Sequence, residues 1–182
     1  FGMIEIRRGE SGLRAWAAEP GEYYNAFDGQ YGGLWRRNGR PPNHLCGVGM
    51  TSQGFDISEP YVVSPEASDP RAAFIFDGVD VTRIGGFGLA GGGAAGREVD
   101  RADQAQGTPE HALVLASSTR HTDIYLMTPE DLLDPTPDWS GTQADIIRAD
   151  LTFFDTIGGC AVFSTGSIAW AGSMAWNGYD NH

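Results

Sequence analysis

Residues 149–164 read ADLTFFDTIGGCAVFS and decide the fold class of this chain. Two runs rich in apolar and β-branched residues, 149–154 and 161–164, flank a turn at 157–159 that contains two glycines. Short β-prone runs on either side of such a turn are typical of paired antiparallel strands. We therefore predict a β-hairpin here and a core built mainly from strands.

Similar β-prone runs occur along the rest of the chain. Residues 111–117 and 124–127 are separated by Ser-Thr-Arg-His, which predicts a second hairpin. Residues 61–63 and 72–76 are further strand candidates, each bounded by Pro, Ser, Asp or Gly. The alternation of apolar and polar residues at 3–7 predicts one more strand, with a single buried face.

The stretches between these runs lack sustained helical periodicity. Residues 21–54 are rich in Gly, Asn, Pro and aromatic side chains and predict ordered loops with short strands. Residues 85–96 hold seven glycines and no charge, which predicts a loop with left-handed backbone. Residues 128–141 carry three prolines and predict a surface connection, whereas 166–176 suit the first turns of a helix. We predict a single α+β domain over residues 1–182, with a strand-rich mixed sheet and few helices.

The composition fits one compact domain that avoids anionic partners. The chain has 182 residues, of which 41% are hydrophobic, and a formal net charge of −12. This charge repels nucleic acid, anionic lipid and phosphorylated substrates. No run approaches the roughly 18 apolar residues of a membrane helix, so we expect a cytoplasmic protein that binds neither nucleic acid nor membrane. We expect Cys46 and Cys160 to be reduced thiols, because a domain of this size does not need a disulfide.

Local motifs for metal, thiol or phosphate chemistry are weak. The four histidines are scattered, with no H-E-x-x-H and no C-x-x-C, so we predict no metal site formed by this chain. Cys46 lies two residues after His44, but a free cysteine is usually a small buried hydrophobe rather than a nucleophile. The glycine runs at 47–49 and 91–93 lack the spacing and the lysine of phosphate loops.

The run Gly-Arg-Glu-Val-Asp-Arg at 96–101 is more informative. It places two carboxylates and two guanidinium groups directly after the glycine-rich loop. In a strand, Glu98 and Asp100 share a face, whereas in a helix Glu98 can pair with Arg101. From composition alone a structural cluster of ion pairs is favoured over a catalytic role.

Five longer strings of the chain are specific enough to compare with a family: GLRAWAAEPGEYY (12–24), LWRRNGRPP (34–42), GLAGGGAAGREVDRAD (88–103), GTPEHALVLASS (107–118) and FSTGSIAWAGSMAWNGYDN (163–181). Together they resemble one family, the large (beta) subunit of N,N-dimethylformamidase, near its C-terminal end. The resemblance implies the C-terminal piece of a larger chain, related to the C-terminal part of a glutamine-amidotransferase-like α/β domain. It also implies that this piece by itself has an incomplete active site and exposes apolar surface.

The same resemblance implies a chemistry in which formamides are hydrolysed to formate and an amine. A mononuclear iron bound by two tyrosines and one carboxylate would act as Lewis acid, with all three ligands outside this chain. Glu98 falls on an acidic position that faces the active site and is implied to act as acid or base. Gly91, Gly92 and Gly93 would admit the substrate. Asp100 and Arg101 would orient the Glu98 segment.

The implied partners are a small amide substrate, a small companion subunit and further copies of the large subunit. None of the six tyrosines of this chain falls in the family's ligand motifs, so Tyr23, Tyr24, Tyr31 and Tyr125 are not expected to bind the metal. Two alternatives stay open. One is a non-catalytic interaction module using the aromatic-rich stretch 23–35, and the other is a thiol-dependent protein like the glutamine amidotransferases.

Overall fold

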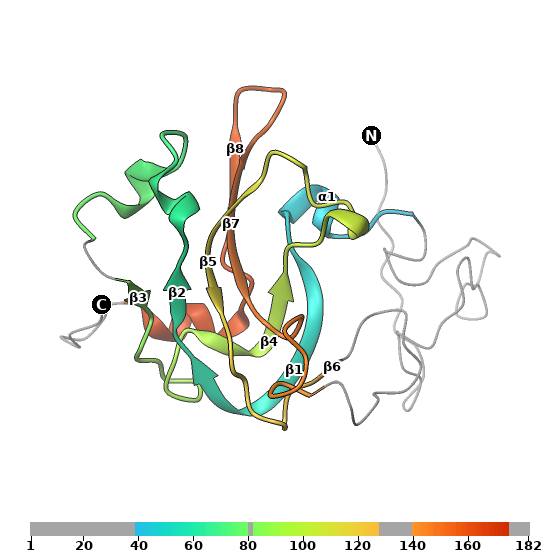
Figure 1. Cartoon of the computed structure of the whole chain (residues 1–182), viewed down its shortest axis with the longest axis vertical. Helices are drawn as coiled ribbons and strands as arrows, with labels where there is room; N and C mark the ends of the chain where they lie inside the picture. Colours follow the sequence, from blue (N-terminus) through green and yellow to red (C-terminus); the bar gives the residue numbers. More distant parts are fainter. Residues whose placement is uncertain (1–38, 80–81, 128–139, 175–182) are drawn as a thin grey trace, which may run out of the picture.

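The computed structural model describes residues 39–79, 82–127 and 140–174, which form two antiparallel sheets (Figure 1). The smaller sheet has the strand order β4-β1-β6, and the larger has the order β3-β2-β5-β7-β8. Helical segments are short. The strands are β1 (Gly49–Glu59), β2 (Tyr61–Val63), β3 (Arg83–Ile84), β4 (Ala95–Arg101), β5 (Leu113–Ser118), β6 (Leu126–Met127), β7 (Asp150–Asp155) and β8 (Ala161–Ser164). The helical segments are α1 (Asn43–Cys46) and the 3-10 turns η2 (Pro65–Ser68), η3 (Ala73–Phe76), η4 (Gln104–Gln106) and η5 (Ile168–Ser173). The prediction of a strand-rich α+β fold with few helices is confirmed.

The hairpin predicted at 149–164 is confirmed as β7 and β8. Phe153 pairs with Phe163, and the turn is closed by the Thr156 N–H, which donates to the Cys160 carbonyl at 2.7 Å. Gly159 takes the left-handed φ of 77° that this turn requires. Residues 150–154 of β7 are all buried, because β7 lies between β5 and β8 and is covered on both faces.

The second predicted hairpin, 111–117 with 124–127, is wrong. β5 lies in the larger sheet, where β2 and β7 occupy both of its edges, so β6 cannot pair with it. The chain turns away after β5 at Arg120, whose φ is 66°, and β6 pairs instead with β1 in the smaller sheet. The run at 61–63 is correctly predicted as strand β2.

Two further predictions are corrected. The strand predicted at 72–76 is instead the 3-10 turn η3 with Ala72 before it, because the Ala72 and Ala73 N–H groups both donate to the carbonyl of Asp69 and start a helical turn. The longest strand, β1, was missed because its sequence GMTSQGFDISE is mostly polar. The helical turns expected at 166–176 appear as η5, whose first turn is capped by the Ser167 hydroxyl.

The glycine-rich loop at 85–96 uses left-handed backbone at Gly85, Gly91 and Gly92, as predicted. The strand expected at 3–7 and most of the connection expected at 128–141 lie outside the described residues.

The core lies between the two sheets. The smaller sheet and its flanking turn contribute Val99, Tyr125 and Met127, and the larger sheet contributes Tyr61, Leu115 and Leu151. Figure 1 shows β2, β5 and β7 alongside one another, with β1 and β4 beside them. One face of the smaller sheet is therefore covered, which leaves its other face turned outward.

Candidate active-site face

Glu98 lies on the outward face of the smaller sheet. Of the two forms left open for residues 96–101, the structure has the strand, β4, in which Val99 is fully buried and Glu98 is exposed. Glu98 pairs with Gln53 of β1, and Gln53 pairs on its other side with Leu126 of β6. A carboxylate, an amide and an apolar side chain therefore stand in one row across the sheet.

A large bulge in β1 borders this row. Gly54 pairs with Arg97 and Glu59 pairs with Ala95, so the four residues 55–58 face the single residue Gly96. The Ser58 N–H donates to the Gly91 carbonyl at 2.9 Å. Bulges re-aim side chains and are over-represented next to active sites.

The bulge turns two apolar side chains outward. Phe55 is 67% exposed and Ile57 is 52% exposed. Between them Asp56 is held in place, because it accepts a hydrogen bond from the Thr122 hydroxyl at 2.8 Å. The smaller sheet thus carries the exposed Glu98 carboxylate and, in the adjoining bulge, two exposed apolar side chains.

Arg97 has a strained backbone next to Glu98. Its φ of 67° lies in the left-handed region, which is unfavourable for a residue with a side chain. The Arg97 N–H donates to the Tyr125 hydroxyl at 3.1 Å, and the guanidinium carbon lies 5.6 Å from the centre of the Phe55 ring. These contacts hold the strained residue and aim its cation over the bulge.

The glycines of the loop pack against β1. A Cβ at Gly91 would lie 2.6 Å from the Asp56 carbonyl oxygen, and one at Gly93 would lie 2.4 Å from that of Ser58. Gly92 is exposed, with open space around it. Gly91 and Gly93 therefore allow a close approach of the loop to β1, and the expected role of all three toward a substrate stays a prediction.

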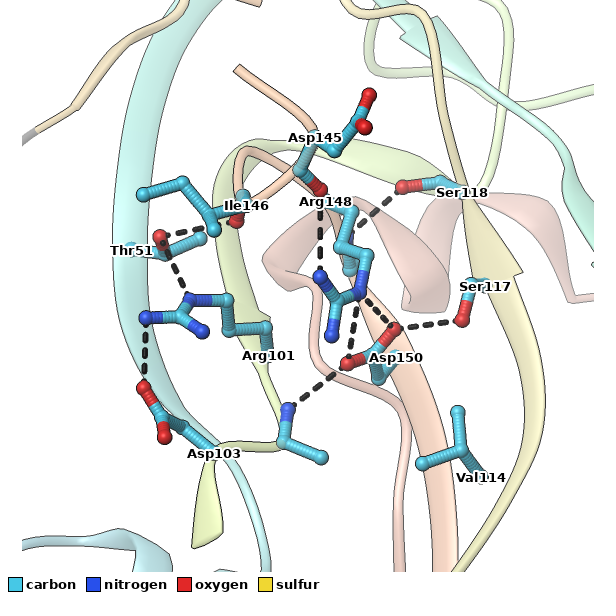
Figure 2. A network of polar contacts seen from close by, with 12 residues as sticks. Thr51, Arg101, Asp103, Val114, Ser117, Ser118, Asp145, Ile146, Arg148 and Asp150 are labelled. Atoms are coloured by element: carbon cyan, nitrogen blue, oxygen red, sulfur yellow. Dashed lines mark hydrogen bonds and ion pairs between the residues drawn. The ribbon is translucent and has the colours of Figure 1, made fainter. Parts of the chain in front are cut away.

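Asp100 and Arg101 are bound to their structural neighbours. The Asp100 N–H donates to the Gly166 carbonyl at 2.8 Å. Arg101 forms an ion pair with Asp103 at 2.7 Å, and its Nε donates to the Thr51 hydroxyl at 3.3 Å (Figure 2). These contacts tie the end of β4 to β1 and so fix the strand on which Glu98 stands.

A second polar network, missed from the sequence, centres on Asp150. Its carboxylate is fully buried and accepts from Arg148 Nε at 2.9 and 3.2 Å, from the Ser117 hydroxyl at 2.6 Å and from the Ala102 N–H at 2.8 Å (Figure 2). Ala102 directly follows β4, so one carboxylate joins β7, β5 and the end of β4. The only sign of this network in the sequence is that Arg148 and Asp150 are two residues apart, a spacing that puts both side chains on one side of an extended segment.

Ser118 and His121 form a buried pair that the sequence did not reveal. The hydroxyl lies 2.8 Å from His121 Nε2 and accepts the Ala149 N–H at 2.8 Å. Burial lowers the pKa of His121 from its ordinary value of 6.5 to about 4. Both side chains are inaccessible to solvent, so the pair closes a turn and cannot meet a substrate in this structure.

The thiol and tyrosine groups of the described residues do not form a metal or nucleophile site. Cys46 and Cys160 are free thiols, and within the described ranges no hydrogen bond joins either sulfur to a histidine. No group of three or more His, Cys, Asp or Glu side chains is placed to hold a metal in this part of the chain. The buried hydroxyls of Tyr61 and Tyr125 bond to the Thr165 carbonyl and the Arg97 N–H.

Burial also raises the pKa of the Tyr61 hydroxyl, which opposes the phenolate that binds ferric iron. The described residues therefore do not fit an iron site. In the ranges that the structure describes, no helix has the length and apolar character needed to span a membrane.

A family model and two curated relatives all place this chain in the same family. The model of the family described as "N,N-dimethylformamidase beta subunit-like, C-terminal" matches residues 2–181. The N,N-dimethylformamidase beta subunit of Paracoccus aminophilus is 46% identical over 181 residues, and that of an Alcaligenes species is 45% identical over 181 residues. Each alignment covers 99% of this chain and 24% of the relative, so the chain spans about a quarter of the length of these proteins.

Proposed function

Because this chain belongs to the N,N-dimethylformamidase beta subunit-like C-terminal family, we propose that it is the C-terminal part of a hydrolase of linear amides. We propose further that Glu98 is its acid-base residue. The observation that carries this assignment is the position of Glu98 on an outward sheet face, directly after the strained Arg97 and next to the anchored bulge of β1, which faces Gly96.

The carboxylate of Glu98 suits both proton transfers in amide hydrolysis. As base it accepts a proton from the attacking water while the new C–O bond forms at the carbonyl carbon. As acid it returns this proton to the amine nitrogen when the C–N bond breaks. A formamide would give formate and an amine by this route, and the balance needs only water.

The remaining parts of the site would come from outside the described residues. A solvent-exposed carboxylate is a weak catalyst, and enclosure strengthens electrostatic interactions in a site. Phe55 and Ile57 provide an apolar margin against which another segment of the intact protein can close over Glu98. We propose that a companion subunit, further copies of the large subunit and an iron bound by residues beyond the described part complete the enzyme.

The test is the substitution Glu98→Gln in the intact enzyme, with formate release from N,N-dimethylformamide as the readout. Loss of one acid-base group costs on the order of a hundredfold or more in turnover, so we expect at least that loss in kcat. Glu110→Gln is the matched control, because Glu110 is also exposed and undergoes the same chemical change. Turnover of Glu98→Gln within a few-fold of the parent would refute the assignment.

A non-catalytic interaction module is the second candidate, favoured by the exposure of Phe55 and Ile57. In that case Phe55→Ser would release a partner from the complex in size-exclusion chromatography, while Glu98→Gln would leave every measured property unchanged. The two substitutions therefore separate the candidates. The aromatic-rich stretch 23–35 lies outside the described residues.

A further inference from the structure

A second surface site lies where the end of β1 passes into β2, beside β3 and the turn that follows β5. Its pocket has a volume of about 270 Å³. The lining residues are Glu59, Pro60, Val62, Arg83, Thr119 and Arg120.

The sheet register explains how distant residues meet there. Val62 of β2 pairs with Arg83 of β3 on one side, and Tyr61 pairs with Ser118 of β5 on the other. Thr119 and Arg120 directly follow Ser118, so they pass beside Pro60, which directly precedes β2. With neighbouring strands about 5 Å apart, the two arginines approach the same point from opposite sides of β2.

Neither guanidinium group has an acidic partner in the part of the chain that the structure describes. Neither Arg83 nor Arg120 makes a side-chain hydrogen bond or an ion pair with a described residue. Carboxylates are in excess in this chain, which has 24 acidic and 12 basic residues. Elsewhere in the described part such pairs do form, at Arg71 with Asp69, Arg101 with Asp103 and Arg148 with Asp150.

The backbone holds Arg120 in an unfavourable conformation that presents it to the pocket. Its φ is 66°, and it lies in the turn closed by the buried bond between Ser118 and His121. Thr119 and Arg120 are exposed, while the residues on either side of them are fully buried. Strain of this kind persists only where the surroundings impose it, and it is concentrated at binding and catalytic sites.

The charge of the pocket and the residues that line it indicate which kind of ligand would fit. Two guanidinium groups and the Glu59 carboxylate have a combined formal charge of +1, which one monoanion neutralises. A planar guanidinium binds a carboxylate through two parallel hydrogen bonds. Pro60 and Val62 form an apolar wall beside these donors, and Val62 is 45% exposed.

We propose that this pocket binds a monocarboxylate with a short apolar tail, the carboxylate between Arg83 and Arg120 and the tail on Pro60 and Val62. The carboxylate belongs either to a free acid or to the end of a polypeptide. Both sources share the same recognition chemistry. The site is independent of Glu98 and of the proposed hydrolase activity.

The experiment is isothermal titration of the intact protein that carries this chain. Butyrate is the free-acid probe, and acetyl-Ala-Ala with a free carboxyl end is the polypeptide probe, with its C-terminal amide as control. We expect at least one probe to bind, and we expect Arg83→Gln and Arg120→Gly each to weaken that binding at least tenfold. Glycine at 120 keeps the left-handed turn, so this variant removes the cation without adding strain.

Arg40→Gln is the matched control, because Arg40 is exposed, lies three residues before α1 and loses the same charge. It should bind the probe as the parent does. Binding of butyrate identifies a free acid, and binding of the peptide alone identifies a chain end. Failure of both probes to bind, or binding that survives both Arg83→Gln and Arg120→Gly, overturns the proposal whatever the activity of Glu98→Gln.

Discussion

Removal of the buried charge of Asp150 should loosen the connection between the two sheets. The substitution Asp150→Asn keeps the shape of the side chain but replaces one acceptor oxygen with an NH₂ group. That group would face donors, because the carboxylate receives hydrogen bonds from Arg148, Ser117 and Ala102. Ala102 follows β4 of the smaller sheet, whereas Ser117 and Asp150 belong to the larger sheet.

The expected loss of stability is large for a substitution that exchanges one oxygen atom for an NH₂ group. Hydrogen bonds to a charged group contribute about 1.5–3 kcal/mol each, and breaking one partner of a buried ion pair costs about 3–5 kcal/mol. The Asp150 side chain is inaccessible to solvent, but that of Arg148 is 27% exposed and can be partly rehydrated. We therefore expect a decrease of about 3 kcal/mol in the free energy of unfolding, at the lower end of that range.

Urea unfolding followed by circular dichroism measures this decrease. With an m value of about 2 kcal/mol per molar urea, the midpoint should fall by about 1.5 M. Asp155→Asn is the matched control, because Asp155 is an exposed residue at the end of the same strand and should lose less than about 0.5 kcal/mol. A loss below about 1 kcal/mol for Asp150→Asn, at unchanged m, would refute the view that this carboxylate joins the sheets.

Two further predictions concern the turn after β5 and the glycine-rich loop. His121 is neutral in the folded state, and burial lowers its pKa to about 4, so the unfolded chain binds a proton that the native state does not as pH falls below 6.5. The contribution of neutral His121 to the free energy of unfolding should therefore be fully present above pH 6.5 and should fall by roughly 3 kcal/mol toward pH 4. The variant His121→Gln should lack this part of the pH dependence when urea midpoints are measured across the same range. Gly93→Ala should lose at least about 2 kcal/mol, since its Cβ would lie 2.4 Å from the Ser58 carbonyl oxygen. Gly92→Ala, in open space at a φ of 86°, should lose only about 1 kcal/mol, and equal losses in thermal unfolding would contradict the packing described for this loop.

The local sequence was sufficient to predict an element where one turn and the β-prone runs on either side of it specify the pairing of the strands. The β7–β8 hairpin is such a case, because the apolar runs and the glycine turn at 157–159 lie within sixteen residues of one another. The strand at 61–63 was also accessible from residue type, whereas the strand form of residues 96–101 was decided by their pairing with β1. Family membership came from the same source, because long strings of residues carry it independently of pairing.

Tertiary structure decided everything that depends on which strand lies next to which. β1 has too few apolar residues to be recognised as a strand, and it forms because β4 and β6 pair with its two sides. The Asp150 carboxylate meets residues 33 and 48 positions away, and the pocket of Arg83 and Arg120 joins residues about 20 to 60 positions apart. Only the order of strands in the sheets brings them together. The sequence alone determined the β-rich character of this protein and its family, since both are written in neighbouring residues. The surroundings of Glu98 were set by pairing between distant strands, because a bulge exists only relative to the strand opposite it.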